Sequence, residues 1–410
     1  MNKLPEDWEI KKLKDIGNVY TGITPPTSDK ENFGNEHLFV TSADIKENKY
    51  IFNSIRKLSN KGFEKTKKFK KGDILYVCIG SIGKIALAKT DFSCNQQINV
   101  LRVNKEIDNE FIYYQLMNSF PYISKFISKR VVPIMNKTTF ENLEISLPSL
   151  DEQKRIAAAL SKIDAYLENT IKLIEEKERF KRGITKKLLT CKEGENIPEA
   201  RFKGFEGEWE IVKLGDIGTI TATGVDKKIN DNETPIKLLN YLDVFNRNKL
   251  YEKEISYMTT ATEKQLEKCN IRKGDLFITP SSEDKKGIAK SSVAMEDFKN
   301  TVYSYHIIRV RFNKEIDLKF KSYMCDTDFF HRQAYRLCDG SGQRYFIKLD
   351  NFRNMEICIP KSIKEQEKIG GYLSLLDEEI DNLKKQKELI KDMKRGAMQK
   401  LLSGEVRVLE

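Results

Sequence analysis

The chain contains the same unit twice, and this repeat constrains the fold more than any other feature. WEIKKLKDIG from Trp8 returns as WEIVKLGDIG from Trp209, differing only at the fourth and seventh positions. NKEID recurs at Asn104 and Asn313, and FENLEISLP from Phe140 corresponds to FRNMEICIP from Phe352. The period of about 200 residues is that of a whole domain rather than a solenoid repeat. We therefore expect two similar domains, in agreement with a length of 410 residues, which exceeds the roughly 250–300 residues of a single core.

The segments between these matches differ strongly. TPPTSDKENFGN in the first copy stands where the second has VDKKINDNETP, and GSIGKIALAKT stands where the second has SSEDKKGIAKS. The matching segments are rich in apolar residues and Gly-Asp turns, whereas the differing ones are polar. Two similar frames therefore carry different loops, and loops on a rigid scaffold are where binding specificity usually lies.

Each copy ends in a long helical pattern with the 4-3 apolar spacing of a coiled-coil seam. The seams comprise Ile156, Leu160, Ile163, Leu167, Ile174, Ile184 and Leu188, and then Ile369, Leu373, Leu376, Ile380, Leu383, Ile390, Ala397 and Leu401. A single helix of this length would expose its seam, so we expect the two helices to pack together; the alternative is that each folds back on its own domain. Gly183 and Gly396, near the helix ends, predict a close backbone approach or a bend.

These patterns predict an α+β fold: two mixed α/β domains, two long paired helices and an internal pseudo-twofold repeat. The expected boundaries are 1–149 for the first domain, 150–190 for the first helix, 191–207 for a linker, 208–360 for the second domain, and 361–410 for the second helix and tail.

The net charge of +11 is concentrated in the first domain. Residues 1–149 contain 23 basic and 17 acidic side chains, a net of +6, whereas residues 191–360 contain 28 and 27, a net of +1. Much of the excess comes from KGFEKTKKFKKGD, which begins at Lys61. A basic cluster favours a polyanion partner, most often nucleic acid; the alternative is a lysine-rich face that only aids solubility.

Several classes of protein are not supported. No apolar run of about 18 residues and no signal-peptide pattern is present, so we expect no membrane association and a cytoplasmic location. The seven cysteines are scattered without a CxxC spacing and there are three histidines, which argues against a disulfide framework or a zinc site. We expect the cysteines to be mostly buried, free thiols.

Signatures of catalysis are also missing. GSIGK at Gly80 has two residues between its glycines and Ile85 after its lysine, so it fails as a Walker A loop. It is interpreted either as a phosphate-contacting loop or as a turn between strands. GxSxG, HExxH and the dinucleotide GxGxxG are absent. The chain is therefore expected to be non-catalytic, with no catalytic or metal residues.

With these features, the chain resembles the specificity (S) subunit of type I restriction-modification systems. The resemblance rests on the two WEI openings, on KGDIL and GSIGK, on LPSLDEQKRIA and IPKSIKEQEKI, and on KKLLT and MQKLLSGEV. It covers essentially the whole chain; the second copy departs from it where GSIGK becomes SSEDKKGIAK.

The resemblance implies two target recognition domains, each reading one half of a split site in double-stranded DNA, with antiparallel helices that set the spacing of the halves. It also implies that two methyltransferase (M) subunits dock on the helices and that motor-nuclease (R) subunits join for cleavage. The chain itself would bind no cofactor; S-adenosylmethionine, ATP and Mg would be held by the partner subunits.

Base edges are read best by Arg, Lys, Asn and Gln, and phosphates by Lys, Arg, Ser, Thr and backbone N–H groups. In the first domain these rules select Thr24, Thr27, Ser28, Ser81, Lys84, Gln96, Gln97, Lys129, Arg130, Asn136 and Lys137. In the second they select Ser281, Ser282, Lys285, Lys286, Ser341, Gln343, Arg344 and Lys348. Each could equally be an ordinary exposed loop residue.

Two other functions remain open. The chain could be a stand-alone DNA-binding or scaffold protein whose helices pair with another partner, or an enzyme with an unrecognised site.

Overall fold

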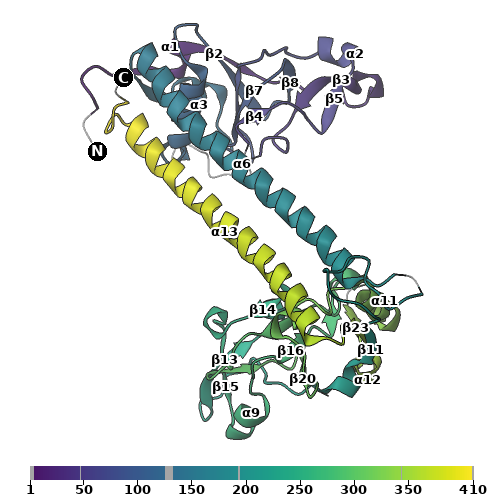
Figure 1. Ribbon diagram of the computed structural model, residues 1–410. Helices are drawn as coiled ribbons and strands as arrows, with labels where there is room; N and C mark the ends of the chain where they lie inside the picture. Colours follow the sequence, from purple (N-terminus) through teal and green to yellow (C-terminus); the bar gives the residue numbers. More distant parts are fainter. Residues whose placement is uncertain (1–3, 47, 125–132, 193, 343, 409–410) are drawn as a thin grey trace. The chain divides into compact units, whose positions relative to one another are not determined.

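The computed structural model describes residues 4–46, 48–124, 133–192, 194–342 and 344–408. It divides into two compact units, whose elements are labelled in Figure 1. Unit 1 comprises residues 1–173 and 383–410, and unit 2 comprises residues 174–382. Each unit therefore contains one half of each long helix.

The elements of unit 1 begin with a strand and a short helix formed by the WEIKKLKDIG segment. They are β1 (Glu9–Lys12), α1 (Leu13–Ile16), β2 (Gly17–Thr21), η1 (Lys30–Asn32), β3 (Phe33–Val40), β4 (Tyr50–Ile51), β5 (Arg56–Leu58), α2 (Asn60–Glu64), β6 (Ile74–Val77), β7 (Ile85–Ala88), β8 (Phe92–Cys94), β9 (Ile98–Val103), α3 (Asn109–Asn118), α4 (Phe120–Ile123), α5 (Lys137–Glu141), β10 (Glu144–Leu147) and the first part of α6 (Leu150–Leu189).

Unit 2 repeats this succession from the second WEI segment onward. Its elements are β11 (Glu210–Lys213), α7 (Leu214–Ile217), β12 (Gly218–Thr221), β13 (Thr234–Leu239), α8 (Tyr241–Phe245), β14 (Lys249–Leu250), η3 (Glu252–Glu254), β15 (Met258–Ala261), α9 (Glu263–Lys268), β16 (Leu276–Ile278), β17 (Ser281–Ser282), η4 (Lys285–Gly287), β18 (Ser291–Ala294), β19 (Thr301–Tyr303), β20 (Ile308–Phe312), α10 (Leu318–Lys321), α11 (Asp328–Leu337), β21 (Asp339–Ser341), β22 (Arg344–Phe346), α12 (Leu349–Asn354), β23 (Glu356–Ile359) and the first part of α13 (Ile363–Leu402).

The sheets of the two units have the same topology. A five-stranded sheet runs β2-β9-β6-β7-β4 in unit 1 and β12-β20-β16-β18-β14 in unit 2. A three-stranded sheet runs β5-β3-β8 in unit 1 and β15-β13-β19 in unit 2, and in both its last pair is parallel while its first is antiparallel. The mixed sheets and the repeat confirm the predicted fold class. Unit 2 also contains a small sheet, β17-β22-β21.

The repeated Gly-Asp turns have a structural explanation. Gly72 and Gly274 adopt φ of 90° and 85°, which glycine accepts without strain. The aspartate that follows is buried and forms a bidentate pair with an arginine of the adjacent strand, β9 or β20: Asp73 with Arg102 at 2.9 and 2.6 Å, and Asp275 with Arg311 at 2.8 and 2.6 Å. The recurrence therefore reflects a buried ion pair in each frame.

The long helices pack against each other in both units, and they do so antiparallel. In unit 1, Asp164 of α6 pairs with Lys394 of α13 at 2.6 Å. In unit 2, Lys177 pairs with Glu379 at 2.6 Å, and Lys181, further along α6, pairs with Asp377, which is earlier in α13. Three lysines that stand at seam positions, Lys177, Lys181 and Lys394, are thus matched by carboxylates of the opposite helix. Most apolar seam residues are buried, among them Ile156, Leu160, Ile174, Leu188, Ile369, Leu373, Leu376, Ile380 and Ile390.

The expectation of a close backbone approach at two helix glycines is wrong. A Cβ added to Gly183 or Gly396 would meet no other atom within 4 Å. Their recurrence is therefore not explained by packing within the described residues.

The start of each long helix is held by a matched set of contacts, which explains the DEQ and KEQ segments. Gln153 donates to the Pro148 carbonyl at 2.9 Å and accepts from the Asp108 N–H at 3.0 Å; Gln366 makes the same two contacts with Pro360 and Asp317. These bonds tie the first turn of each helix to the strand exit and to the cap of α3 or α10.

A buried glutamate beside each of these glutamines pairs with an arginine from the segment that follows the other helix. Glu152 pairs with Arg407 at 2.6 Å, and Glu365 with Arg201 at 2.8 Å. The segment expected as a linker, 191–207, thus includes an arginine bound to unit 2.

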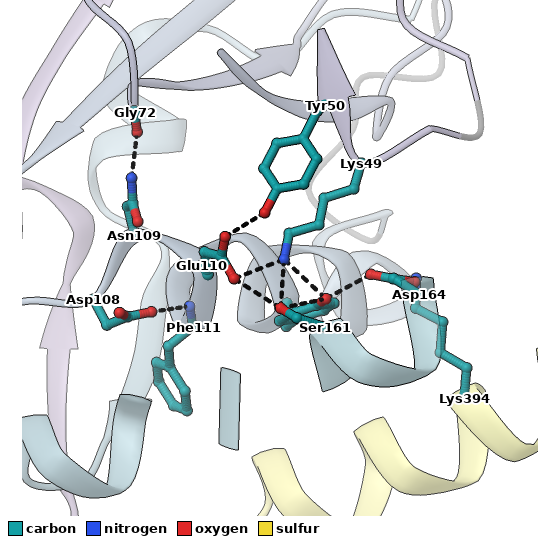
Figure 2. Close-up of polar contacts among 11 residues, drawn as sticks. Lys49, Tyr50, Gly72, Asp108, Asn109, Glu110, Phe111, Ser161, Asp164 and Lys394 are labelled. Atoms are coloured by element: carbon teal, nitrogen blue, oxygen red, sulfur yellow. Dashed lines mark hydrogen bonds and ion pairs between the residues drawn. The ribbon is translucent and has the colours of Figure 1, made fainter. Parts of the chain in front are cut away.

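A buried polar cluster joins the sheet domain of unit 1 to both helices (Figure 2). The Lys49 amine, whose side chain is 2% exposed, donates to Glu110 at 2.8 Å, to Ser161 at 2.7 Å and to the Tyr114 hydroxyl at 3.1 Å. Tyr114 in turn donates to Asp164 at 2.5 Å. Burial lowers the pKa of Lys49.

Unit 2 has a counterpart cluster with a different charge balance. Lys249 donates to Ser374 at 2.9 Å and lies 3.7 Å from Asp377, which also accepts from Tyr323. Lys319 stands two residues after the cap residue Asp317, which is the position that Glu110 occupies in unit 1. Only unit 1 therefore encloses a lysine–glutamate pair at this junction.

The seven cysteines are free thiols. Cys78, Cys94, Cys269 and Cys325 are buried, as expected, whereas Cys191, Cys338 and Cys358 are half-buried. Among the helices that the structure describes, none has a stretch apolar and long enough to cross a bilayer.

Candidate nucleic-acid interface

In each unit, loops from distant parts of the chain converge where a parallel pair of strands ends. In unit 1 the pair is β3 and β8, which are followed by Thr41 and by residues 95–97. In unit 2 the pair is β13 and β19, followed by α8 and by residues 304–306. The carboxyl ends of parallel strands are a common place for ligand sites in α/β folds.

In unit 1 this edge is a cluster of amide and hydroxyl groups. Thr24 Oγ1 donates to Gln96 Oε1 at 2.6 Å, and Gln97 Oε1 accepts from Ser42 Oγ at 3.2 Å and from Asn95 Nδ2 at 3.0 Å. Gln96 is exposed and Gln97 half-buried. Such groups are suited to base edges.

GSIGK lies beside this cluster and is a turn between the antiparallel strands β6 and β7. Gly83 adopts φ of 93°, and a Cβ there would lie 2.1 Å from the Phe120 ring. The exposed Lys84 donates to the Ser42 carbonyl at 3.1 Å. Ser81 is exposed at the tip of the turn. Of the expected residues of unit 1, Thr24 and Gln96 are thus hydrogen-bonded to each other, and Lys84 and Gln97 are joined through Ser42.

In unit 2 the same edge is a cleft of about 820 Å³ with aromatic and cationic walls. Tyr241 and Phe245 stack with ring centroids 5.6 Å apart, and His306, Lys290 and Arg344 also line the cleft. Cations beside aromatic faces suit phosphates and stacked bases.

A hairpin formed by β21 and β22 closes one side of this cleft. Strand β22 pairs with β17, opposing Ser281 to Phe346 and Ser282 to Tyr345. The Arg344 guanidinium lies 3.4 Å from Ser281 Oγ. The structure therefore brings together three of the residues selected in the second domain. Glu283 and Asp284 also line this cleft; a carboxylate can accept from the amino group of cytosine.

His306 is neutral at physiological pH. Burial, and then the positive charges of Lys227 and Arg344, lower the pKa of its imidazole below the ordinary 6.5. The Tyr305 ring lies over it with centroids 4.0 Å apart. A neutral imidazole offers one donor and one acceptor nitrogen.

Several expected residues have contacts of their own outside these clusters. Asn136 caps α5 by accepting from the Thr139 N–H at 2.8 Å, and Lys137 pairs with Glu141 at 3.2 Å. Thr27 and Ser28 are exposed in the turn before η1.

Three expected residues of the second domain belong to the hairpin or to its flanks. Ser341 pairs with Arg344 in the register of β21 and β22. Lys348 pairs with Asp339 at 3.3 Å, and the Lys285 amine lies 5.3 Å from the Tyr345 ring centroid. Lys129, Arg130 and Gln343 lie outside the described residues, as does the Lys286 side chain.

Sequence reasoning missed several residues of these clusters, and the repeat itself could have found two of them, Tyr305 and His306. The NKEID segments are offset by 209, which places Tyr305 and His306 opposite Gln96 and Gln97. The structure has the same pairing, because the turns are closed by equivalent bonds: Ile98 N–H to the carbonyl of residue 95 and Ile307 N–H to that of residue 304. Ser42 and Tyr241 had no such signal.

Lys84 of unit 1 and Lys290 of unit 2 also occupy equivalent positions. The Lys84 carbonyl accepts from the Val77 N–H, and the Lys290 carbonyl accepts from the Thr279 N–H, both at 2.9 Å.

Among the residues that the structure describes, no group of three or more His, Cys, Asp and Glu side chains is placed to hold a metal ion.

Comparison with known proteins agrees with these features. The chain is 25% identical, over 99% of its length and 94% of the relative's, to the Type I restriction enzyme MjaVIII specificity subunit of Methanocaldococcus jannaschii. It is 26% identical to the MjaIX specificity subunit of the same organism, over 100% of its length and 96% of the relative's.

Solved structures show the same fold. The S subunit of the type I restriction-modification system from M. genitalium is 18% identical with a TM-score of 0.57, covering 98% of this chain and 97% of that one. A chain solved in work on complex assembly and conformational transition of the type I R-M system is 15% identical with a TM-score of 0.62, covering 99% and 100%. The model of the type I restriction modification DNA specificity domain matches residues 5–176 and again 206–392. The chain therefore belongs to the family of type I restriction-modification DNA specificity domains, of which it carries two copies.

Proposed function

We propose that the chain is the non-catalytic specificity subunit of a type I restriction-modification complex, in which each unit reads one half of a split site in double-stranded DNA. The long helices would set the number of unread base pairs and bind two methyltransferase (M) subunits, and motor-nuclease (R) subunits would join for cleavage. S-adenosylmethionine, ATP and Mg would be bound by those partner subunits.

One observation carries this proposal: equivalent loops of the same strand frame present different polar groups. At the turn between β8 and β9, unit 1 has Asn95, Gln96 and Gln97; the corresponding turn of unit 2 has Ser304, Tyr305 and His306. Two readers of different half-sites need the same frame with different contacts, which these two turns provide.

The charge of unit 1 supports contact with a polyanion but is partly balanced locally. In the basic stretch, Lys61 and Lys65 pair with Asp29 at 3.2 Å, and Lys70 pairs with Asp91 at 2.7 Å. Counterion release depends on the cations that neutralise phosphates. Removing this stretch should therefore flatten the salt dependence of binding by less than its lysine count implies.

The proposal is tested by expressing the chain with its cognate methyltransferase subunit and sequencing the methylated adenines of the host DNA. We expect one motif made of two short words with a fixed gap. Exchanging residues 1–149 for those of another family member should change only one word, and deleting whole turns from both helices should change only the gap. A change of both words after the first exchange would contradict the modular assignment.

The chief alternative is a stand-alone DNA-binding or scaffold protein with another helical partner. In that case the chain should fail to form a stable complex with the methyltransferase subunit while still binding DNA by itself.

A further inference from the structure

The turn at residues 95–97 fixes the direction in which its amide groups point. The backbone N–H of Gln97 donates to Asn95 Oδ1 at 3.2 Å. A backbone N–H can only donate, so this contact identifies the oxygen of the Asn95 amide and leaves its Nδ2 to donate to Gln97 Oε1 at 3.0 Å. Ser42 Oγ donates to the same oxygen at 3.2 Å.

Gln97 is thereby left with only donor groups to offer a ligand. Both lone pairs of its Oε1 are occupied, by Ser42 and Asn95, whereas the Oε1 of Gln96 accepts only from Thr24, at 2.6 Å, within the described residues and can accept once more. Within the described residues, neither Nε2 donates to a protein acceptor. Two NH₂ groups from consecutive residues therefore remain available at the edge of the cluster.

We propose, as a refinement of the function proposed above, that the Gln97 NH₂ group contacts a base with a major-groove acceptor and excludes cytosine at one position of the half-site of unit 1. In the major groove guanine O6 and N7, thymine O4 and adenine N7 are acceptors, whereas cytosine presents only the N4 donor. A contact restricted to donors gains a hydrogen bond from guanine, thymine or adenine and leaves two donors opposed at cytosine. Gln97 is therefore a specificity-determining residue.

The turn is held rigidly enough for such discrimination. It follows β8 directly, and its backbone packs against the end of β2: a Cβ added to Gly22 would lie 2.3 Å from the Asn95 carbonyl oxygen and 2.4 Å from that of Cys94. A contact group that is already positioned loses little entropy on binding.

The matching turn of unit 2 follows a different rule. Ser304 takes the place of Asn95, accepting from the His306 N–H at 3.3 Å. Neutral His306 and the Tyr305 hydroxyl can each donate and accept. Only Gln97, in the turn of unit 1, is restricted to donating, and converting the amides of this turn is expected to affect one half-site.

The test converts each amide to a carboxylate of nearly the same shape. Gln97→Glu and Gln96→Glu keep an oxygen for Ser42, Asn95 and Thr24 but replace the outward donor with an acceptor. Gln265→Glu in unit 2 is the matched control, because its Oε1 also accepts from a threonine hydroxyl, Thr262, at 2.9 Å. The complex with the methyltransferase subunit is incubated with a library of duplexes randomised at each word, and the bound duplexes are sequenced.

For the wild type we expect cytosine to be excluded at one position of the word assigned to unit 1 by exchange of residues 1–149. Gln97→Glu places an acceptor there and should admit cytosine, lowering the enrichment of the original base over cytosine by about 5- to 150-fold, the range for about 1–3 kcal/mol. Gln96→Glu should change the preference less, because the Gln96 oxygen can already accept. The other word and the gap should be unchanged, and Gln265→Glu should alter neither word.

Unchanged enrichment with Gln97→Glu, or a change confined to the other word, overturns the inference. Intact complexes are verified by size-exclusion chromatography, and a variant that does not assemble is replaced by Gln97→Leu, which should abolish the preference without adding charge. If the wild type enriches no two-word motif, the proposed function itself fails, which is a distinct outcome.

Discussion

The buried Lys49 provides a quantitative test of how unit 1 is held on its helices. Its amine makes hydrogen bonds with Glu110, Ser161 and Tyr114 between 2.7 and 3.1 Å. Lys49→Met fills the same volume without a charge. It leaves the Glu110 carboxylate without its cation and removes one partner each from Ser161 and Tyr114.

The expected cost follows from burial. Removing one member of a buried ion pair destabilises by about 3–5 kcal/mol, because the remaining charge is left uncompensated. The Glu110 side chain keeps 30% exposure and still accepts from Tyr50 and Ser161, which reduces the penalty. We expect a loss of about 2–4 kcal/mol. Lys70→Met is the control, since its pair with Asp91 is 64% and 53% exposed, for which about 0–1 kcal/mol is expected.

The assay uses the single tryptophan buried in each unit, Trp8 and Trp209. In a common Trp209→Phe background, urea unfolding followed by fluorescence reports unit 1 alone. A shift for Lys49→Met no larger than that for Lys70→Met would refute the reasoning, because it would mean that a methionine packs there as well as the ion pair does. Such an outcome is known for buried pairs replaced entirely by apolar residues.

Three further predictions follow from local geometry. Gly183→Ala and Gly396→Ala should each raise the free energy of unfolding by about 0.5–1 kcal/mol, measured in urea, since alanine costs less helical entropy and meets no neighbour; destabilisation would reveal an unseen packing role. Cys191 should react with iodoacetamide faster than the buried thiols at neutral pH, because the Cys358 thiol at 3.2 Å lowers the pKa of Cys191; Cys358→Ala should slow that reaction, and an unchanged rate would contradict the cause. Because the folded pKa of His306 lies below 6.5, unit 2 should lose stability as the pH falls from 6.5 through that lowered value. The free energy of unfolding of unit 2, followed by Trp209 fluorescence, should therefore differ less between about pH 5 and about pH 7.5 in His306→Gln than in the wild type.

The helices and the repeat were predictable because they depend on local periodicity. The expected helices, 150–190 and 361–410, correspond to Leu150–Leu189 and Ile363–Leu402. An apolar residue every three or four positions specifies a buried stripe whatever the rest of the chain does. The same local reasoning failed at Gly183, where the sequence cannot tell whether a neighbour lies close.

The candidate interface was predictable only in part. Residue type alone selected Gln96, Gln97, Ser281 and Arg344, which do lie in the two clusters, but it also selected Asn136, whose side chain caps a helix. A polar loop side chain looks the same in a sequence whether it satisfies its own backbone or faces a ligand.

The sequence by itself determined that two copies of one frame carry different loops and end in long paired helices. Only the tertiary structure decided which loops meet, because residues 42 and 97 become neighbours solely through the parallel pairing of β3 with β8. It also decided the chemistry of the turn at residues 95–97. An amide can donate or accept until its neighbours occupy one end, and at Gln97 the hydrogen bonds from Ser42 and Asn95 leave only the NH₂ donors.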